Sequence, residues 1–170
     1  MNKNAVPNIF TLSNLAFGVL SLIMTFQADY KMASLFILIA GLIDRYDGRV
    51  ARFLDVSSEI GKELDSLADL VSFGVAPSIL VFNLYSFSEL GLLGYLLLLI
   101  FPMSGAYRLA RYNITSFDGL FTGVPITAAG SFLALYSLLT IDRVVQPILP
   151  IILVVMFSYL MISKLRFKKV

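Results

Sequence analysis

The sequence contains no cysteine and no histidine among its 170 residues. Without cysteine, the chain has no disulfide, no thiolate nucleophile and no cysteine-bound metal. Without histidine, no imidazole binds a metal or carries a proton near neutral pH. Acid–base and metal chemistry therefore falls mainly to the eleven aspartates and glutamates, whose ligand atom is oxygen.

Charge is also scarce in this sequence. Charged residues make up 14% of the chain and hydrophobic residues 58%, whereas an ordinary soluble domain is roughly 25% charged. The mean hydropathy is +0.87, and a water-soluble protein of this size could not cover so much apolar surface. The net charge of +2 is too small to indicate nucleic-acid binding. We therefore predict one integral membrane domain over residues 1–170.

Uncharged runs predict the membrane-spanning segments. Five runs of 18 to 25 residues carry no charge, and each is long enough to cross the ~30 Å hydrocarbon core as a helix. A sixth run, 32–43, has only 12 residues, so its helix must continue through the charged residues that follow. We predict an all-α fold of six transmembrane helices, in which Pro77 kinks the third. The expected ranges are 8–27, 32–53, 60–85, 90–110, 121–141 and 145–163.

The distribution of basic residues predicts the orientation. Six spans place both termini on one side of the membrane, and eleven of the thirteen lysines and arginines then fall on that side. Cytoplasmic segments carry such an excess of positive charge. We expect a multi-pass cell-membrane protein whose termini and charged segment face the cytoplasm.

Acidic residues are concentrated in one segment, 44–69, which holds seven of the eleven. Asp44 and Asp47 are three residues apart, and Asp65 and Asp69 are four apart, so each pair shares one face of its helix. The connection between the two helices is short, so they pack antiparallel and the four carboxylates can meet near the cytoplasmic surface. Such an oxygen cluster suits Mg²⁺, Mn²⁺ or Ca²⁺, and four aspartates suffice to bridge two ions.

Three small residues lie in phase with these aspartates, namely Gly48, Ala51 and Gly61. They remove side-chain bulk, so a ligand or another backbone can approach closely. One alternative is a buried salt-bridge network between the two helices. Another is an ion path through the membrane, but the runs 32–43 and 70–88 are apolar, which favours a pocket open to one side only.

The charged segment carries a longer pattern, D-x-x-D-G-x-x-A-R-x8-G-x-x-x-D-x-x-x-D, from Asp44 to Asp69. It resembles the complete signature of the CDP-alcohol phosphatidyltransferase family, and the likeness extends over essentially the whole chain. Members of that family use a divalent metal to move a phosphatidyl group from a CDP-linked lipid to an alcohol, and they release CMP. The resemblance also implies a six-helix core and a homodimer.

The resemblance implies roles for particular residues. Asp44, Asp47, Asp65 and Asp69 would hold two divalent ions, Mg²⁺ or Mn²⁺ with Ca²⁺ possible, and Asp69 would also take the acceptor's proton. For Asn8 and Thr11, which resemble the entry to the nucleotide pocket, helix capping is the alternative. The residues implied in CDP-lipid binding are Asn8, Thr11, Asn14, Gly48, Ala51, Arg52 and Gly61.

Three further stretches, 64–77, 108–113 and 121–125, resemble the phosphatidylserine synthase branch, whose acceptor is L-serine. Serine carries a carboxylate, which arginine binds well, so Arg108, Arg111 and Asn113 are candidate serine-binding residues. The alternative for the arginines is a cytoplasmic membrane anchor. The expected substrates are CDP-diacylglycerol, or an archaeal CDP-lipid, and L-serine. Glycerol phosphate, inositol or inositol phosphate is the alternative acceptor.

Overall fold

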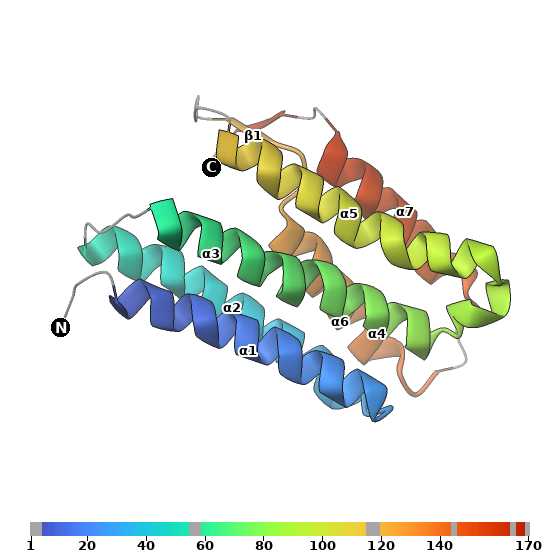
Figure 1. Ribbon diagram of the computed structural model, residues 1–170. Coiled ribbons are helices and arrows are strands. Elements are labelled where there is room, and N and C mark those ends of the chain that lie inside the picture. Colours follow the sequence, from blue (N-terminus) through green and yellow to red (C-terminus); the bar gives the residue numbers. More distant parts are fainter. Residues whose placement is uncertain (1–4, 55–58, 115–119, 144–145, 164–165, 169–170) are drawn as a thin grey trace.

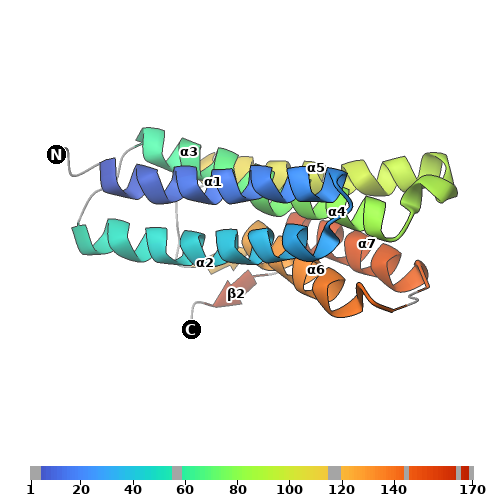
Figure 2. The ribbon, with the colours of Figure 1, turned by 90° about the horizontal axis from the view of Figure 1, so that it is seen from below.

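The computed structural model describes the backbone of residues 5–54, 59–114, 120–143, 146–163 and 166–168, and their side chains except in 5–7, 47–54, 120–122 and 166–168. Within these ranges the chain forms long helices that run back and forth beside one another (Figure 1). Helices α1 (Ala5–Phe26) and α2 (Tyr30–Leu54) lie side by side along most of their length in both views (Figures 1 and 2). The predicted helical architecture is therefore confirmed.

The remaining elements continue this up-and-down path. After α1 and α2 comes a third long helical stretch, here called the third rod. It is continuous, because α3, a π-helical segment η1 and α4 follow one another without a break. A short 3₁₀ turn and α5 come next, and α6 and α7 complete the helices. Their bounds are α3 (Glu59–Asp69), η1 (Leu70–Val75), α4 (Ala76–Leu84), η2 (Phe87–Leu90), α5 (Leu92–Ile114), β1 (Leu120–Thr122), α6 (Ile126–Thr140), α7 (Ile148–Ile162) and β2 (Arg166–Lys168).

Three helical stretches of the described chain are long and apolar enough to cross a membrane: Asn8–Phe26, Glu59–Leu84 and Leu92–Ile114. Helices α6 and α7 are apolar but only 15 residues long, which corresponds to about 22 Å. Large apolar side chains cover the outside of the bundle, as lipid contact requires. The molecule is therefore consistent with a membrane protein, while six spans and the side of the termini stay predictions.

The start of the fifth predicted helix differs from expectation. Helix was predicted from residue 121, but Leu120–Thr122 form strand β1, which pairs antiparallel with β2, and α6 begins only at Ile126. Gly123 has φ +75°, a backbone conformation that residues other than glycine rarely adopt. Pro125 has an extended ψ of 139°. The chain therefore cannot be helical here. Strands of three residues leave too short a pattern for the sequence to reveal.

The third rod also departs from regular α-helix, close to the predicted kink at Pro77. The departure is the π-helical segment η1, which ends where the N–H of Ala76 donates to the carbonyl of Val71, five residues back. Pro77 follows immediately and has no N–H to donate. Asp69 is the last residue before η1, so the change in helical geometry begins directly after an acidic side chain.

Neighbouring helices approach η1 closely through glycine. A Cβ atom on Gly18 of α1 would collide with Ser72, and one on Gly130 of α6 would collide with the backbone of Phe73. Phe73 itself is completely buried. Helices α1 and α6 are therefore packed directly against the backbone of η1, which fixes the rod that carries Asp69 from two sides.

Candidate active site

Three of the four predicted aspartates come together between α2 and α3. Carboxylate oxygens of Asp44, Asp65 and Asp69 all lie within 4.8 Å of one another. Asp44 and Asp65 are half-buried, whereas Asp69 is 8% exposed. Helical spacing thus brought the pair on α3 onto one face, which is turned toward Asp44 of α2, while α1 packs against both helices. The side chain of Asp47 lies outside the described part of the structure.

The chemistry of this cluster fits a hard divalent cation. Three carboxylates at such short range repel one another unless a positive charge or a proton lies between them. Their donor atoms are all oxygen, which Mg²⁺, Mn²⁺ and Ca²⁺ prefer. Asp44, Asp65 and Asp69 are therefore the described residues that can hold such an ion.

Asp69 is held by two side chains from other helices. The amide nitrogen Nδ2 of Asn14 on α1 donates to Oδ1 at 3.1 Å, and the hydroxyl Oγ1 of Thr127 on α6 donates to Oδ2 at 3.4 Å. The backbone carbonyl of Asn14 accepts a hydrogen bond from Ser72 at 3.0 Å. The sequence predicted CDP-lipid binding for Asn14 and no role for Thr127. It did not predict their contacts with Asp69, because residue spacing indicates contacts within one helix but not between distant helices.

The other predicted residues of the CDP-lipid pocket lie on three helices. Asn8 and Thr11 lie on α1 at intervals of three residues before Asn14, and Thr11 is buried. Gly61 lies one turn before Asp65 on α3. Gly48, Ala51 and Arg52 lie on α2, but what surrounds them is outside the described part of the structure.

Arg108 on α5 is one of the three predicted serine-binding residues. It is 8% exposed, and its positive charge interacts with the carboxylate of Asp69. The Nε atom of this guanidinium has no hydrogen-bond partner among the described residues. A buried arginine with a donor to spare can bind an anionic group that enters beside Asp69.

Arg111 and Asn113 make contacts with other helices. The guanidinium of Arg111 donates to the backbone carbonyls at the end of α7, with the shortest bond, 2.9 Å, to Ile162, and so caps that helix. The amide of Asn113 donates to Glu63 at 3.1 Å and to Ser66 at 3.0 Å. Both residues therefore fasten α5 to its neighbours.

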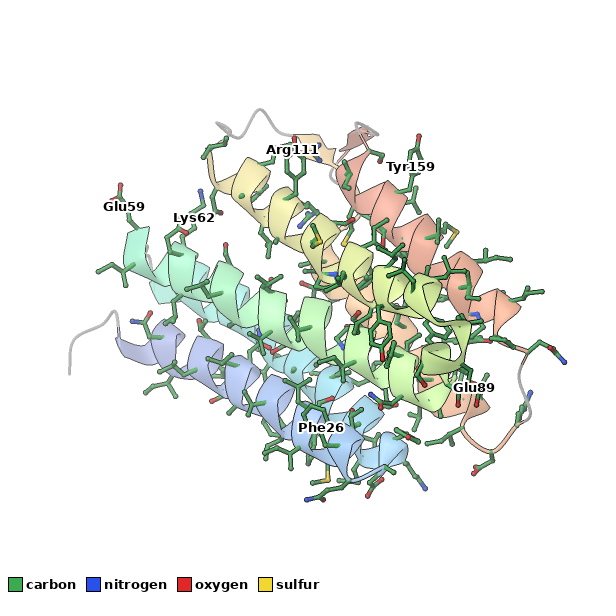
Figure 3. All side chains as sticks on the ribbon, turned by 45° about the vertical axis from the view of Figure 1, so that its right-hand side comes forward. Phe26, Glu59, Lys62, Glu89, Arg111 and Tyr159 are labelled. Carbon is green, nitrogen blue, oxygen red and sulfur yellow. The ribbon has the colours of Figure 1, made fainter. Side chains whose placement is uncertain are left out.

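A lysine completes the link between α3 and α5. The ammonium of Lys62 donates to the backbone carbonyl of Asn113 at 3.0 Å and lies 5.8 Å from the centre of the Tyr112 ring. Figure 3 shows Glu59, Lys62 and Arg111 at one end of the molecule and Phe26 and Glu89 at the other. The polar contacts between α3, α5 and α7 thus gather at the end from which α3 begins.

The sequence is similar to known proteins over most of its length. The sequence model of the CDP-alcohol phosphatidyltransferase family matches residues 4–165. A CDP-diacylglycerol–serine O-phosphatidyltransferase of Bacillus subtilis is 37% identical over 96% of this chain and 90% of its own length. Proteins with the same name from Helicobacter pylori J99 and Methanocaldococcus jannaschii are 41% and 34% identical, over 78% and 96% of this chain. The chain covers 57% of the length of the Helicobacter protein and 74% of the length of the Methanocaldococcus protein.

Proposed function

The chain belongs to the CDP-alcohol phosphatidyltransferase family, and from this premise we propose that it transfers a phosphatidyl group from a CDP-diacylglycerol-type lipid to L-serine. The observation that carries the proposal is the meeting of Asp44, Asp65 and Asp69, which are positions of the family signature, at one point. Relatives named for serine transfer, from bacteria and an archaeon, support the choice of acceptor. CMP is the other product of the proposed reaction.

The four aspartates would have two roles, ion binding and proton transfer. Asp44 and Asp65, with Asp47 as the fourth carboxylate, would hold two divalent ions together with Asp69. Such ions, when bound, neutralise the charge on the diphosphate of the CDP-lipid and stabilise the leaving CMP. Asp69 would also take the proton of the serine hydroxyl as that oxygen attacks the lipid-side phosphorus. Its burial beside two other carboxylates supports this role, because water is largely excluded there.

Arg108 is the residue that we propose for binding the serine carboxylate. Its charge interacts with Asp69, and its Nε atom is buried without a partner among the described residues. Arg111 and Asn113 would then support the pocket from the end of α5 through their contacts to α7 and α3. The residues proposed for the CDP-lipid are Asn8, Thr11, Asn14, Gly48, Ala51, Arg52 and Gly61.

The proposed orientation places the aspartate cluster toward the cytoplasm. The chain has no cysteine, so each single cysteine introduced by substitution is the only thiol. Glu59 and Glu89 are both exposed and lie at opposite ends of the molecule (Figure 3). In intact cells, a membrane-impermeant maleimide should label Glu89→Cys, and it should label Glu59→Cys only after permeabilisation. The reverse pattern would contradict a cytoplasmic site.

The function itself is tested by following CMP release from CDP-diacylglycerol by the purified protein. Release should require both serine and added Mg²⁺ or Mn²⁺. Asp69→Asn is nearly isosteric, so this variant should lose turnover and still bind the CDP-lipid measurably. Full activity of Asp69→Asn would rule out the role given to this carboxylate.

A further inference from the structure

Both oxygens of Asp69 are occupied on one side by donors from outside its own helix. Asn14 reaches Oδ1 from α1, and Thr127 reaches Oδ2 from α6. Each carboxylate oxygen has two lone pairs, so two acceptor sites remain for the groups on the side of Asp44 and Asp65. With both oxygens engaged, the plane of the carboxylate cannot rotate without breaking a hydrogen bond.

The position of Thr127 is set by close packing at the start of α6. Its neighbour Ile126 is 1% exposed and lies over two glycines of other elements. A Cβ on Gly74 would come within 3.3 Å of Ile126 Cδ1, and one on Gly105 would collide with that atom. Gly74 belongs to η1 and Gly105 to α5, so the first turn of α6 sits close to both elements. The Thr127 hydroxyl consequently reaches the residue directly before η1, Asp69.

The position of Asn14 is fixed in a similar way from the opposite helix. Asn14 is 1% exposed, and the hydroxyl of Ser72 donates to its backbone carbonyl at 3.0 Å. One turn further along α1, Gly18 lies against the backbone of Ser72. The amide must present its nitrogen to Asp69, because the carboxylate only accepts hydrogen bonds when ionised.

We infer that Thr127, together with Asn14, is a positioning residue that holds the carboxylate of Asp69 in the orientation required for ion binding and proton transfer. This inference rests on the proposed function. It concerns a threonine that lies outside the aspartate pattern. The Thr127 hydroxyl lies 3.4 Å from the carboxylate oxygen, which is longer than the roughly 2.5–3.0 Å usual for O–H···O hydrogen bonds.

The test compares Thr127→Val, which removes only the hydroxyl, with Thr127→Ser, which keeps it. Thr127→Val should lower kcat roughly 3- to 10-fold relative to the original chain. The KM for serine and the KM for the CDP-lipid should both stay within about twofold, because the contacts to the substrates are unchanged. Thr127→Ser should restore kcat to within about twofold of the original chain. The rise in melting temperature on adding Mn²⁺ should be smaller in Thr127→Val than in Thr127→Ser or in the original chain.

Thr140→Val is the matched control on the same helix. Thr140 bonds to Tyr85 at 2.6 Å near the other end of α6, so its replacement should lower the melting temperature without changing kcat or the response to Mn²⁺. The inference fails if Thr127→Val keeps full kcat and full Mn²⁺ stabilisation, or if Thr127→Ser is as impaired as Thr127→Val. If the original chain transfers no phosphatidyl group at all, the proposed function fails, and the Mn²⁺ measurement alone still decides whether Thr127 positions Asp69.

Discussion

At the scale of single residues, Asp69 accepts hydrogen bonds from Asn14 of α1 and Thr127 of α6. The spacing of Asp65 and Asp69 on one helix, and of the aspartates before them, was enough to anticipate a carboxylate cluster, because helical periodicity is a local property. It could not anticipate that Asn14 and Thr127 hold Asp69, since those contacts depend on how separate helices pack. It also treated Arg108 and Arg111 as equivalent, whereas the structure gives them different surroundings.

That difference leads to a prediction about serine binding. Arg108→Lys should raise the KM for serine roughly tenfold, because lysine cannot reproduce the planar, multiply donating guanidinium beside Asp69. The KM for the CDP-lipid should change little. Steady-state kinetics with each substrate varied in turn provides the measurement.

Arg111→Lys is the matched comparison, since Arg111 binds the carbonyls at the end of α7. This variant should lower the melting temperature and leave the KM for serine within about twofold. Equal effects of the two substitutions on the KM for serine would mean that Arg108 has no special part in recognising the acceptor.

At the scale of elements, the ends and irregularities of helices were the least predictable features. The rods were recognisable from apolar runs, but β1 and β2 are too short to leave a pattern, and the late start of α6 depends on the backbone at Gly123 and Pro125. Pro77 predicted a kink in the third rod, and a departure from regular α-helix lies directly before it. Its form, a π-helical segment packed against Gly18 and Gly130, depends on tertiary contacts.

The packing of α6 on η1 can be tested with one methyl group. Gly130→Ala places a Cβ against the buried backbone of Phe73, which cannot move without shifting η1. We expect it to lower the free energy of unfolding by about 2 kcal/mol, the cost of overpacking a core, and to reduce turnover because η1 directly follows Asp69. Thermal unfolding in detergent and CMP release measure the two effects.

Gly41→Ala on α2 is the control for the same substitution. Its Cβ would lie 3.0 Å from the hydroxyl of Ser131, a side-chain end that can turn away. Alanine is also the better helix former by about 1 kcal/mol, so stability should stay equal or rise. A Gly130→Ala variant as stable and active as Gly41→Ala would show that α6 is not tightly fixed against η1.

At the scale of the whole molecule, composition was the most reliable guide. A chain with 58% hydrophobic residues and neither histidine nor cysteine was expected to be a helical membrane protein with oxygen-based chemistry, and the helical bundle with its aspartate cluster agrees. The number of spans follows less directly, because α6 and α7 are shorter than the predicted 121–141 and 145–163. The expected homodimer stays a prediction.

Transfer of a phosphatidyl group to serine by this bundle can be tested with a panel of acceptors. Purified protein is incubated with CDP-diacylglycerol and Mn²⁺ or Mg²⁺, and CMP release is followed with serine, glycerol phosphate, inositol or inositol phosphate, and with Asp69→Asn as the blank. We predict rapid release with serine and only background release with the other acceptors. Release with another acceptor and not with serine would show that serine is not the acceptor. Release by Asp69→Asn at the full rate would show that this carboxylate is not required for the reaction.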